Sequence, residues 1–222
     1  RQFWDGRAEP LEQQAVQPIH NPTEMGSDWR EVTEKLRQDN DYKKMFGQIY
    51  SGGIIAENIT DAIATFERSL YTPNSRFDDY LRGNDNALTS EEKYGYELFK
   101  SYGCVSCHQG VNVGGNMFQK LGVMKDYFAE RKVKERDFGR YNVTHNEVDK
   151  FTFKVPSLRL AALTPPYFHN GTANTLKEAV DVMFEYQLGR TATDQEKDAI
   201  ISFIKSLVGE LKQTGVNNNV AK

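Results

Sequence analysis

Apolar residues recur every three or four positions through much of the first third of the chain, a spacing typical of amphipathic helices. The longest such stretch predicts a helix over residues 58–70. A second helix is expected to begin at Gly26-Ser27-Asp28, and a short one over residues 8–16 carries Pro10 in its first turn. The expected buried faces consist of Trp29, Val32 and Leu36 in one helix and of Ile59, Ala62, Ile63, Phe66 and Leu70 in another.

The rest of the chain carries helix-start signals in which a Thr is followed three residues later by a Glu, the spacing of a capping box. They begin at Thr89, Thr175 and Thr193. Residues 110–156 are rich in glycine and mixed in charge, which predicts a loop with one short helix near residues 124–132. Strand signals are weak throughout, so the predicted fold class is all-α. The last helix is expected to bury Ala199, Ile200, Phe203, Ile204, Leu207 and Val208.

The segment Thr72-Pro73-Asn74-Ser75 interrupts the helical pattern with turn-forming residues. We therefore expect a domain boundary here, with one domain over residues 1–75 and a second over residues 76–222. A chain of 222 residues is long enough for two small domains.

The amino-acid composition mainly excludes certain classes of function. The formal net charge of -3 leaves no basic excess for binding nucleic acid, and no run approaches the ~20 apolar residues of a membrane span. We therefore expect no nucleic acid partner and no membrane span. The two cysteines of the chain both belong to one short motif, so a scaffold held by several disulfides is excluded by number.

That motif, Cys104-Val105-Ser106-Cys107-His108, is the strongest chemical signal in the sequence. Two thiols at this spacing can add to the two vinyl groups of one haem, and the following His is then held over the iron. A zinc site would need a second Cys/His pair, which the sequence lacks. A thioredoxin-like redox motif would follow a strand, and the adjacent His favours haem. We predict a covalent haem c held by Cys104, Cys107 and His108, which also implies an extracytoplasmic location.

His108 supplies only one of the two axial positions of a haem iron. In a cytochrome c fold the Met ligand lies well downstream of the attachment motif, which favours Met183, and a thioether raises the reduction potential relative to a second His. The alternative is that Met183 only packs in the core. We expect His169 to shape its turn or to bond a haem propionate. The other candidate ligands are His20, His145, Met25, Met45, Met117 and Met124.

Six segments, in order and at matching spacing, resemble the bacterial di-haem cytochrome c peroxidase family over nearly the whole chain. Any one segment carries little information, whereas the ordered set is specific. The segments are Phe3-Trp4-Asp5-Gly6-Arg7, Leu11-Glu12-Gln13-Gln14-Ala15, Asn21-Pro22-Thr23-Glu24-Met25-Gly26, the Cys104 motif, Lys154-Val155-Pro156-Ser157-Leu158-Arg159, and Thr164-Pro165-Pro166-Tyr167-Phe168-His169-Asn170-Gly171.

This resemblance implies two cytochrome c-like haem domains, of which the C-terminal one is complete in this chain and the N-terminal one is partial. Electrons from a small cytochrome c or cupredoxin enter at a high-potential haem, whose ligands match His108 and Met183. They pass by way of Trp4 to a peroxidatic haem, where hydrogen peroxide is reduced to water. The implied activity is that of a cytochrome-c peroxidase in the periplasm, commonly a homodimer.

The same resemblance assigns Gln14 and Glu24 to the peroxide side of the peroxidatic haem, where a carboxylate can shuttle the proton that O–O cleavage requires. It also matches the backbone carbonyls of Thr164 and Pro166 to a calcium site. Without the resemblance, Glu24 would be interpreted as a solvated loop residue, Gln14 as a helix-surface residue and Trp4 as a core aromatic.

The sequence departs from the family pattern at its beginning. The first attachment motif of the family precedes the segment at residues 3–7, whereas this sequence starts at Arg1. We therefore expect a second haem c attached upstream of Arg1, together with the switchable distal His and the Asn that completes the calcium site.

Two other functions are weighed against the peroxidase. A plain electron-transfer cytochrome with one His/Met haem needs no peroxide pocket, so the presence of Glu24, Gln14 and Trp4 argues against it. A related di-haem enzyme that matures a tryptophan-derived quinone cofactor has a Tyr at the position of Met183, which argues against that activity.

Overall fold

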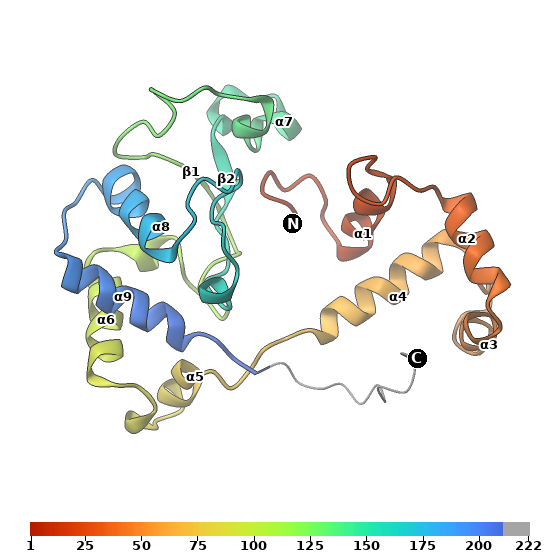
Figure 1. Cartoon of the computed structure of the whole chain (residues 1–222), viewed down its shortest axis with the longest axis horizontal. Coiled ribbons are helices and arrows are strands. Elements are labelled where there is room, and N and C mark those ends of the chain that lie inside the picture. Colours follow the sequence, from red (N-terminus) through yellow and green to blue (C-terminus); the bar gives the residue numbers. More distant parts are fainter. Residues whose placement is uncertain (211–222) are drawn as a thin grey trace. The chain divides into compact units, whose positions relative to one another are not determined.

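The computed structural model describes residues 1–210, which are mainly helical (Figure 1). The chain divides into two compact units. Among the described residues, the first comprises residues 1–3 and 7–71, and the second comprises residues 4–6 and 72–210. None of the described helices combines the length and the apolar content that crossing a membrane requires.

The first unit is built from helices whose apolar sides enclose a small core. Its helices are α1 (Leu11–His20), α2 (Trp29–Gln38), α3 (Asn40–Ile49) and α4 (Ala56–Ser69). α1 packs along α4, and Arg68 forms an ion pair with Glu12 across this contact. Phe46, Ile54 and Ile59 are buried, with the apolar side of α2 packed against them.

Side-chain caps determine where α2 and α3 begin. The Asp28 carboxylate accepts a hydrogen bond from an amide of the first turn of α2, at 2.8 Å. Asp39 does the same for two amides of α3, so this helix starts directly after α2 ends. The sequence analysis did not predict α3. The predicted start of α1 at residue 8 was wrong, because Pro10 has an extended backbone and precedes the first helical residue.

The second unit combines helices with a small two-stranded sheet. Its helices are α5 (Arg76–Leu81), α6 (Ser90–Ser101), α7 (Tyr141–Thr144), α8 (Leu176–Val182) and α9 (Asp194–Ser206), and short 3₁₀ turns lie at Asp85–Ala87, Cys104–Ser106, Glu135–Phe138, Glu147–Asp149 and Ala161–Leu163. β1 (Phe118–Lys120) pairs antiparallel with β2 (Thr152–Lys154), with Gln119 opposite Phe153. The sequence analysis predicted neither the strands nor α5.

The crossing of α6 over α9 forms the main core of this unit. Both helices begin with the predicted capping boxes, at Thr89 and Thr193. Gly95 of α6 lies directly against the backbone of Ala199 in α9, an approach that leaves no room for a side chain. The crossing holds the C-terminal end of α6, which leads into the Cys104 motif.

Residues 121–134 form irregular turns, so the predicted helix near residues 124–132 was wrong. Tyr127 and Phe128 are buried in an aromatic cluster rather than lying along a helix face. The Met124 amide donates to the carbonyl of Tyr186 instead of to a helical neighbour. The apolar residues of this segment are spaced to fit that cluster, and this spacing is not the three-to-four-residue period of a helix.

Candidate functional site

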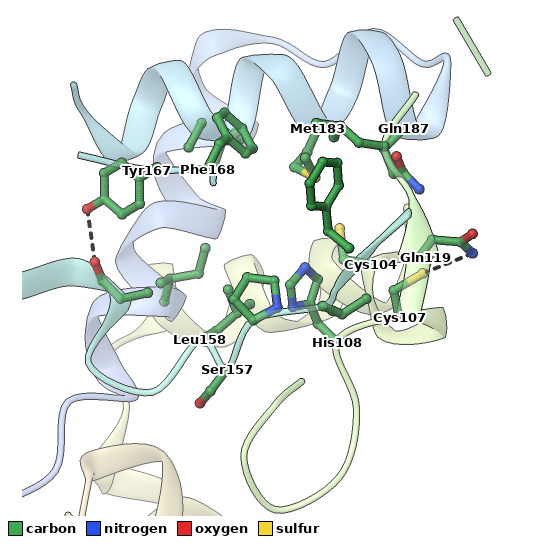
Figure 2. A pocket seen from close by; sticks show the side chains of 18 of the residues that line it. Cys104, Cys107, His108, Gln119, Ser157, Leu158, Tyr167, Phe168, Met183 and Gln187 are labelled. Carbon is green, nitrogen blue, oxygen red and sulfur yellow. Dashed lines mark hydrogen bonds between the residues drawn. The ribbon is translucent and has the colours of Figure 1, made fainter. Parts of the chain in front are cut away.

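The second unit encloses a cavity of about 400 Å³ with a mainly apolar wall (Figure 2). This volume falls within the range of small-molecule and cofactor sites, roughly 300–1,000 Å³. Residues of α6, α8, α9 and β2 contribute to the wall. The apolar lining residues include Phe99, Phe153, Leu158, Phe168, Val180, Phe184, Ile200 and Ile204.

The Cys104 motif follows α6 and lies along one side of this cavity. Gly103 has a φ of 93°, a conformation that favours glycine and lets the chain turn out of α6. The amides of Cys107 and His108 both donate to the Cys104 carbonyl, at 3.3 and 3.0 Å. This tight turn brings both thiols and the imidazole to the cavity. Burial raises the pKa of the Cys104 thiol to about 11, so that thiol is protonated at neutral pH.

His108 is enclosed on the Nδ1 side of its ring. Nδ1 is buried and has no hydrogen-bond partner among the described residues. Burial lowers the pKa of His108, although the backbone of Val113 and Pro156 acts in the opposite direction. The ring is therefore neutral at neutral pH, which is the form that ligates a metal. With Nδ1 enclosed, Nε2 is the nitrogen left for a ligand bound in the cavity.

Met183 lies on the opposite side of the cavity from His108 (Figure 2). It is the first residue of a wider π-helical turn, Met183–Leu188, that continues α8, and such turns are frequent at functional sites. Thr175 caps α8 by accepting a hydrogen bond from the Glu178 amide at 3.2 Å. The predicted box is only half formed, because the Glu178 carboxylate accepts from the Asn174 amide instead.

These residues fit a haem c. Cys104 and Cys107 provide two thiols for thioether bonds, and His108 and Met183 provide an imidazole and a thioether on opposite sides of an apolar cavity. Of the other candidate axial ligands, all of which lie within residues 1–210, only His169 lines the cavity. Residues 1–210 contain no group of three or more His, Cys, Asp or Glu side chains arranged to hold a metal ion.

His169 is held by a buried carboxylate. Its Nε2 lies 2.7 Å from Asp137 Oδ1, and the two side chains are only 4% and 7% exposed. The imidazole also stacks on Phe153, with the ring centroids 4.1 Å apart. These contacts favour a role for His169 in shaping its segment, because Nε2 already has a partner.

Trp4 lines the same cavity and is 38% exposed, so it is not a core aromatic. Its carbonyl accepts a hydrogen bond from the Lys154 amide at 2.7 Å, which ties this short segment to β2. The structure thus brings Trp4 together with the Cys104 motif and Met183.

Thr164 and Pro166 line the cavity as well, and both are exposed. Their proposed role is through backbone carbonyls that would bind calcium. The contacts of the described residues do not test this role of the two carbonyls, and it stays a prediction.

Gln14 and Glu24 belong to the first unit, whereas the cavity and its lining residues belong to the second. Gln14 lies partly buried in α1. Glu24 is exposed in the turn after α1 and accepts a hydrogen bond from Asn21 Nδ2 at 2.7 Å. Their assignment to a peroxide pocket also stays a prediction.

The sequence analysis did not identify the residues that hold the loop behind His108. This loop, residues 110–115, pairs with residues 155–158: the Gly115 amide donates to Val155, and the Leu158 amide donates to Val113. A Cβ at Gly114 would lie 2.9 Å from the Pro156 carbonyl carbon and 3.2 Å from His108 Nδ1, so only glycine fits. The available signal was the Gly114-Gly115 pair, which could have marked a close backbone approach.

Comparisons with known proteins extend over almost the whole chain. Residues 1–86 match the family model described as di-haem cytochrome c peroxidase. Cytochrome c peroxidase Ccp of Escherichia coli (strain K12) is 49% identical over 210 residues, which cover 94% of this chain and 45% of that protein. Cytochrome c551 peroxidase of Nitrosomonas europaea is 47% identical over 214 residues, covering 94% of this chain and 62% of that protein. The chain therefore spans about half the length of the first of these relatives and about three fifths of the second.

Among solved structures, a MauG-like protein associated with microbial copper homeostasis has a similar fold. The TM-score is 0.81 at 27% sequence identity, and the match covers 93% of this chain and 73% of that one. The predicted all-α, cytochrome c-like fold class is confirmed.

Proposed function

We propose that this chain belongs to the di-haem cytochrome c peroxidase family, whose model matches residues 1–86, and that it is part of a periplasmic enzyme that reduces hydrogen peroxide to water. A small cytochrome c or cupredoxin supplies the electrons. The observation that carries this proposal is the convergence of Cys104, Cys107, His108 and Met183 on one apolar cavity. A thioether opposite an imidazole is the ligand pair of an electron-transfer haem.

In this proposal, Cys104 and Cys107 would hold haem c covalently, and His108 and Met183 would ligate its iron. When bound, the haem supplies reversible one-electron transfer. The apolar wall excludes water, and together with the Met183 thioether this stabilises the less charged, reduced state. The second unit is therefore suited to accept electrons from a donor protein.

Trp4 is proposed to assist electron transfer toward the peroxidatic centre. Its place on the cavity wall, where the Lys154 amide holds its carbonyl, supports this role. The peroxidatic haem itself is proposed to be attached upstream of Arg1. A calcium ion bound by the Thr164 and Pro166 carbonyls and a homodimeric assembly complete the proposal.

Glu24 is proposed as the group that moves protons during peroxide cleavage, with Gln14 lining the same pocket. Reduction of hydrogen peroxide to two water molecules consumes two electrons and two protons, so a carboxylate that takes and delivers a proton is required near the reacting oxygens. The exposed position of Glu24 leaves its carboxylate open to solvent protons.

Two measurements on the full-length protein test the proposal: the number of haems per polypeptide from intact mass, and the turnover of hydrogen peroxide with a reduced small cytochrome c. Two haems with peroxide turnover are expected. One haem with reversible reduction and no turnover would instead identify an electron-transfer cytochrome.

A further inference from the structure

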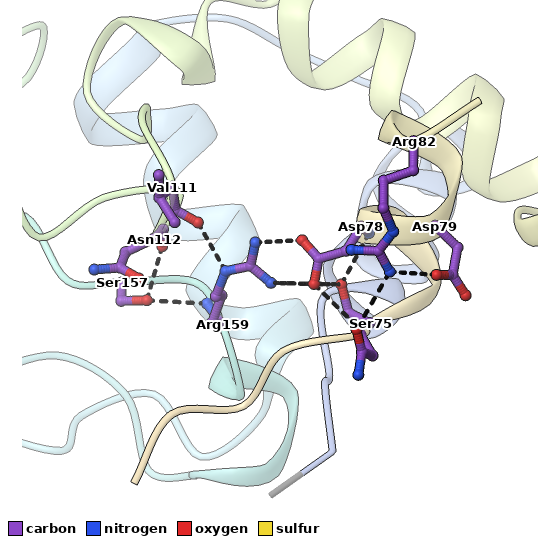
Figure 3. Close-up of polar contacts among 9 residues, drawn as sticks. Ser75, Asp78, Asp79, Arg82, Val111, Asn112, Ser157 and Arg159 are labelled. Atoms are coloured by element: carbon purple, nitrogen blue, oxygen red, sulfur yellow. Dashed lines mark hydrogen bonds and ion pairs between the residues drawn. The ribbon is translucent and has the colours of Figure 1, made fainter. Parts of the chain in front are cut away.

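Arg159 forms a dense set of polar contacts in the second unit (Figure 3). Its Nη2 and Nη1 donate to the two carboxylate oxygens of Asp78 in α5, at 2.6 and 3.0 Å. Its Nε donates to the Val111 carbonyl at 2.7 Å. One guanidinium thus connects α5 with the loop that follows the Cys104 motif.

This pair is largely enclosed, because the side chains of Arg159 and Asp78 are each only 15% exposed. Asp78 also accepts hydrogen bonds from the Ser75 amide and hydroxyl, at 3.0 and 2.8 Å. Burial acts to raise the pKa of Asp78, but the hydrogen bonds from Arg159 and Ser75 hold it below its usual value. The carboxylate is therefore charged at neutral pH, and the contact is a bidentate ion pair.

The neighbours of Arg159 connect this ion pair to the loop behind His108. The Ser157 hydroxyl donates to the Asn112 carbonyl at 2.7 Å. Pro156 lies against Gly114, and Gly114 in turn lies against the Nδ1 side of His108. A displacement of residues 156–159 would therefore be passed directly to the imidazole.

We infer that Arg159 and Asp78 are positioning residues that set the orientation of His108 and thereby the reduction potential of the haem it ligates. The inference rests on the proposed function, since it needs the haem in the cavity. Arg159 suits the task because its planar guanidinium satisfies Asp78 and Val111 at once, in fixed directions. A lysine could keep the charge and would lose this geometry.

The structure offers a matched control at the C-terminal end of the same helix. Arg82 forms an ion pair with Asp79 in α5, but these side chains are 56% and 45% exposed. Within residues 1–210, the side chain of Arg82 donates hydrogen bonds to Asn74 and Asp79 and to no residue of the loop behind His108. Its removal should therefore leave the haem unchanged, and exposed ion pairs contribute little to stability.

The test compares Arg159→Gln, Arg159→Lys and Arg82→Gln in the full-length protein. Haem content is measured first, followed by a spectroscopic redox titration of the high-potential haem and a denaturation curve. We expect Arg159→Gln to reduce the equilibrium constant for haem reduction about tenfold, which for one electron is ~59 mV. Arg159→Lys should give part of this shift, and Arg82→Gln should give none.

Three outcomes have distinct meanings. A wild-type protein without haem at the Cys104 motif would contradict the proposed function itself. If haem is present and Arg159→Gln lowers stability while its reduction potential equals that of the wild type, the residue is only structural and the inference is wrong. If Arg159→Gln does not fold and incorporate haem, Asp78→Asn is used in its place, because this variant keeps the contact of Arg159 with Val111. An unchanged reduction potential in Asp78→Asn contradicts the inference.

Discussion

Replacing Gly95 by Ala tests the helix crossing on which the cavity depends. A Cβ at this position would lie 2.5 Å from the Ala199 carbonyl carbon, closer still to its oxygen, and 3.1 Å from the Ile200 nitrogen. All three atoms belong to the backbone of α9, so no side chain can rotate away. The two helices must therefore separate to admit a single methyl group.

The expected cost follows from two opposing terms. Forcing an extra methyl group into a packed core typically costs about 1–3 kcal/mol, and the clash with backbone atoms places this case at about 3 kcal/mol. Alanine recovers about 1 kcal/mol, because it is the better helix former. The free energy of unfolding of the second unit should therefore fall by about 2 kcal/mol.

Denaturant unfolding followed by the absorbance of the haem at the Cys104 motif reports on the second unit, because Phe99 of α6 and Ile200 of α9 line the cavity. Gly47→Ala in α3 is the matched control: nothing lies within 4 Å of the added methyl group, so it should stabilise its helix by up to about 1 kcal/mol. That unfolding is followed by circular dichroism. A Gly95→Ala protein as stable as the wild type would refute the reasoning from the crossing.

Three further predictions address the site and its surroundings. Met183→His should keep the haem six-coordinate but lower its potential, so turnover with a protein donor falls while peroxide still reacts with chemically reduced enzyme; an unchanged high-potential spectrum would exclude Met183 as ligand. Glu24→Gln should retain both haems and lose about 10²–10⁴-fold in peroxide turnover, and wild-type turnover would remove Glu24 from the mechanism. Burial acts to raise the pKa of Glu92, but hydrogen bonds from Arg76 and the Thr89 amide outweigh it and hold the pKa below its usual value of 4.5. The Glu92 carboxylate thus stabilises the fold above pH 4.5, and this stabilisation is lost as the pH falls through the lowered pKa. Glu92→Gln should therefore lower the free energy of unfolding by about 2 kcal/mol at pH 7 and make stability less dependent on pH in the acid range. A stability–pH profile equal to that of the wild type would contradict this.

The sequence by itself was sufficient where the physics is local. A capping box joins residues three apart, so Thr89 and Thr193 marked the starts of α6 and α9 correctly. The Cys104 motif is likewise local, because one tight turn brings its thiols and imidazole to the same side of the chain. The all-α fold class followed from helical spacing for the same reason.

The tertiary structure decided whatever depends on partners distant in sequence. The segment near residue 127 carries apolar residues at helix-like density, yet its aromatic rings pack into a cluster with residues far along the chain, and no helix forms. Met183 and His108 share a cavity only because α8 and the Cys104 motif are held on opposite sides of the same core. The ion pair of Arg159 with Asp78 joins positions 81 residues apart. Local spacing carries no information about such contacts, because the chain between two distant residues can form many different loops. Packing of the core determines which of these loops forms.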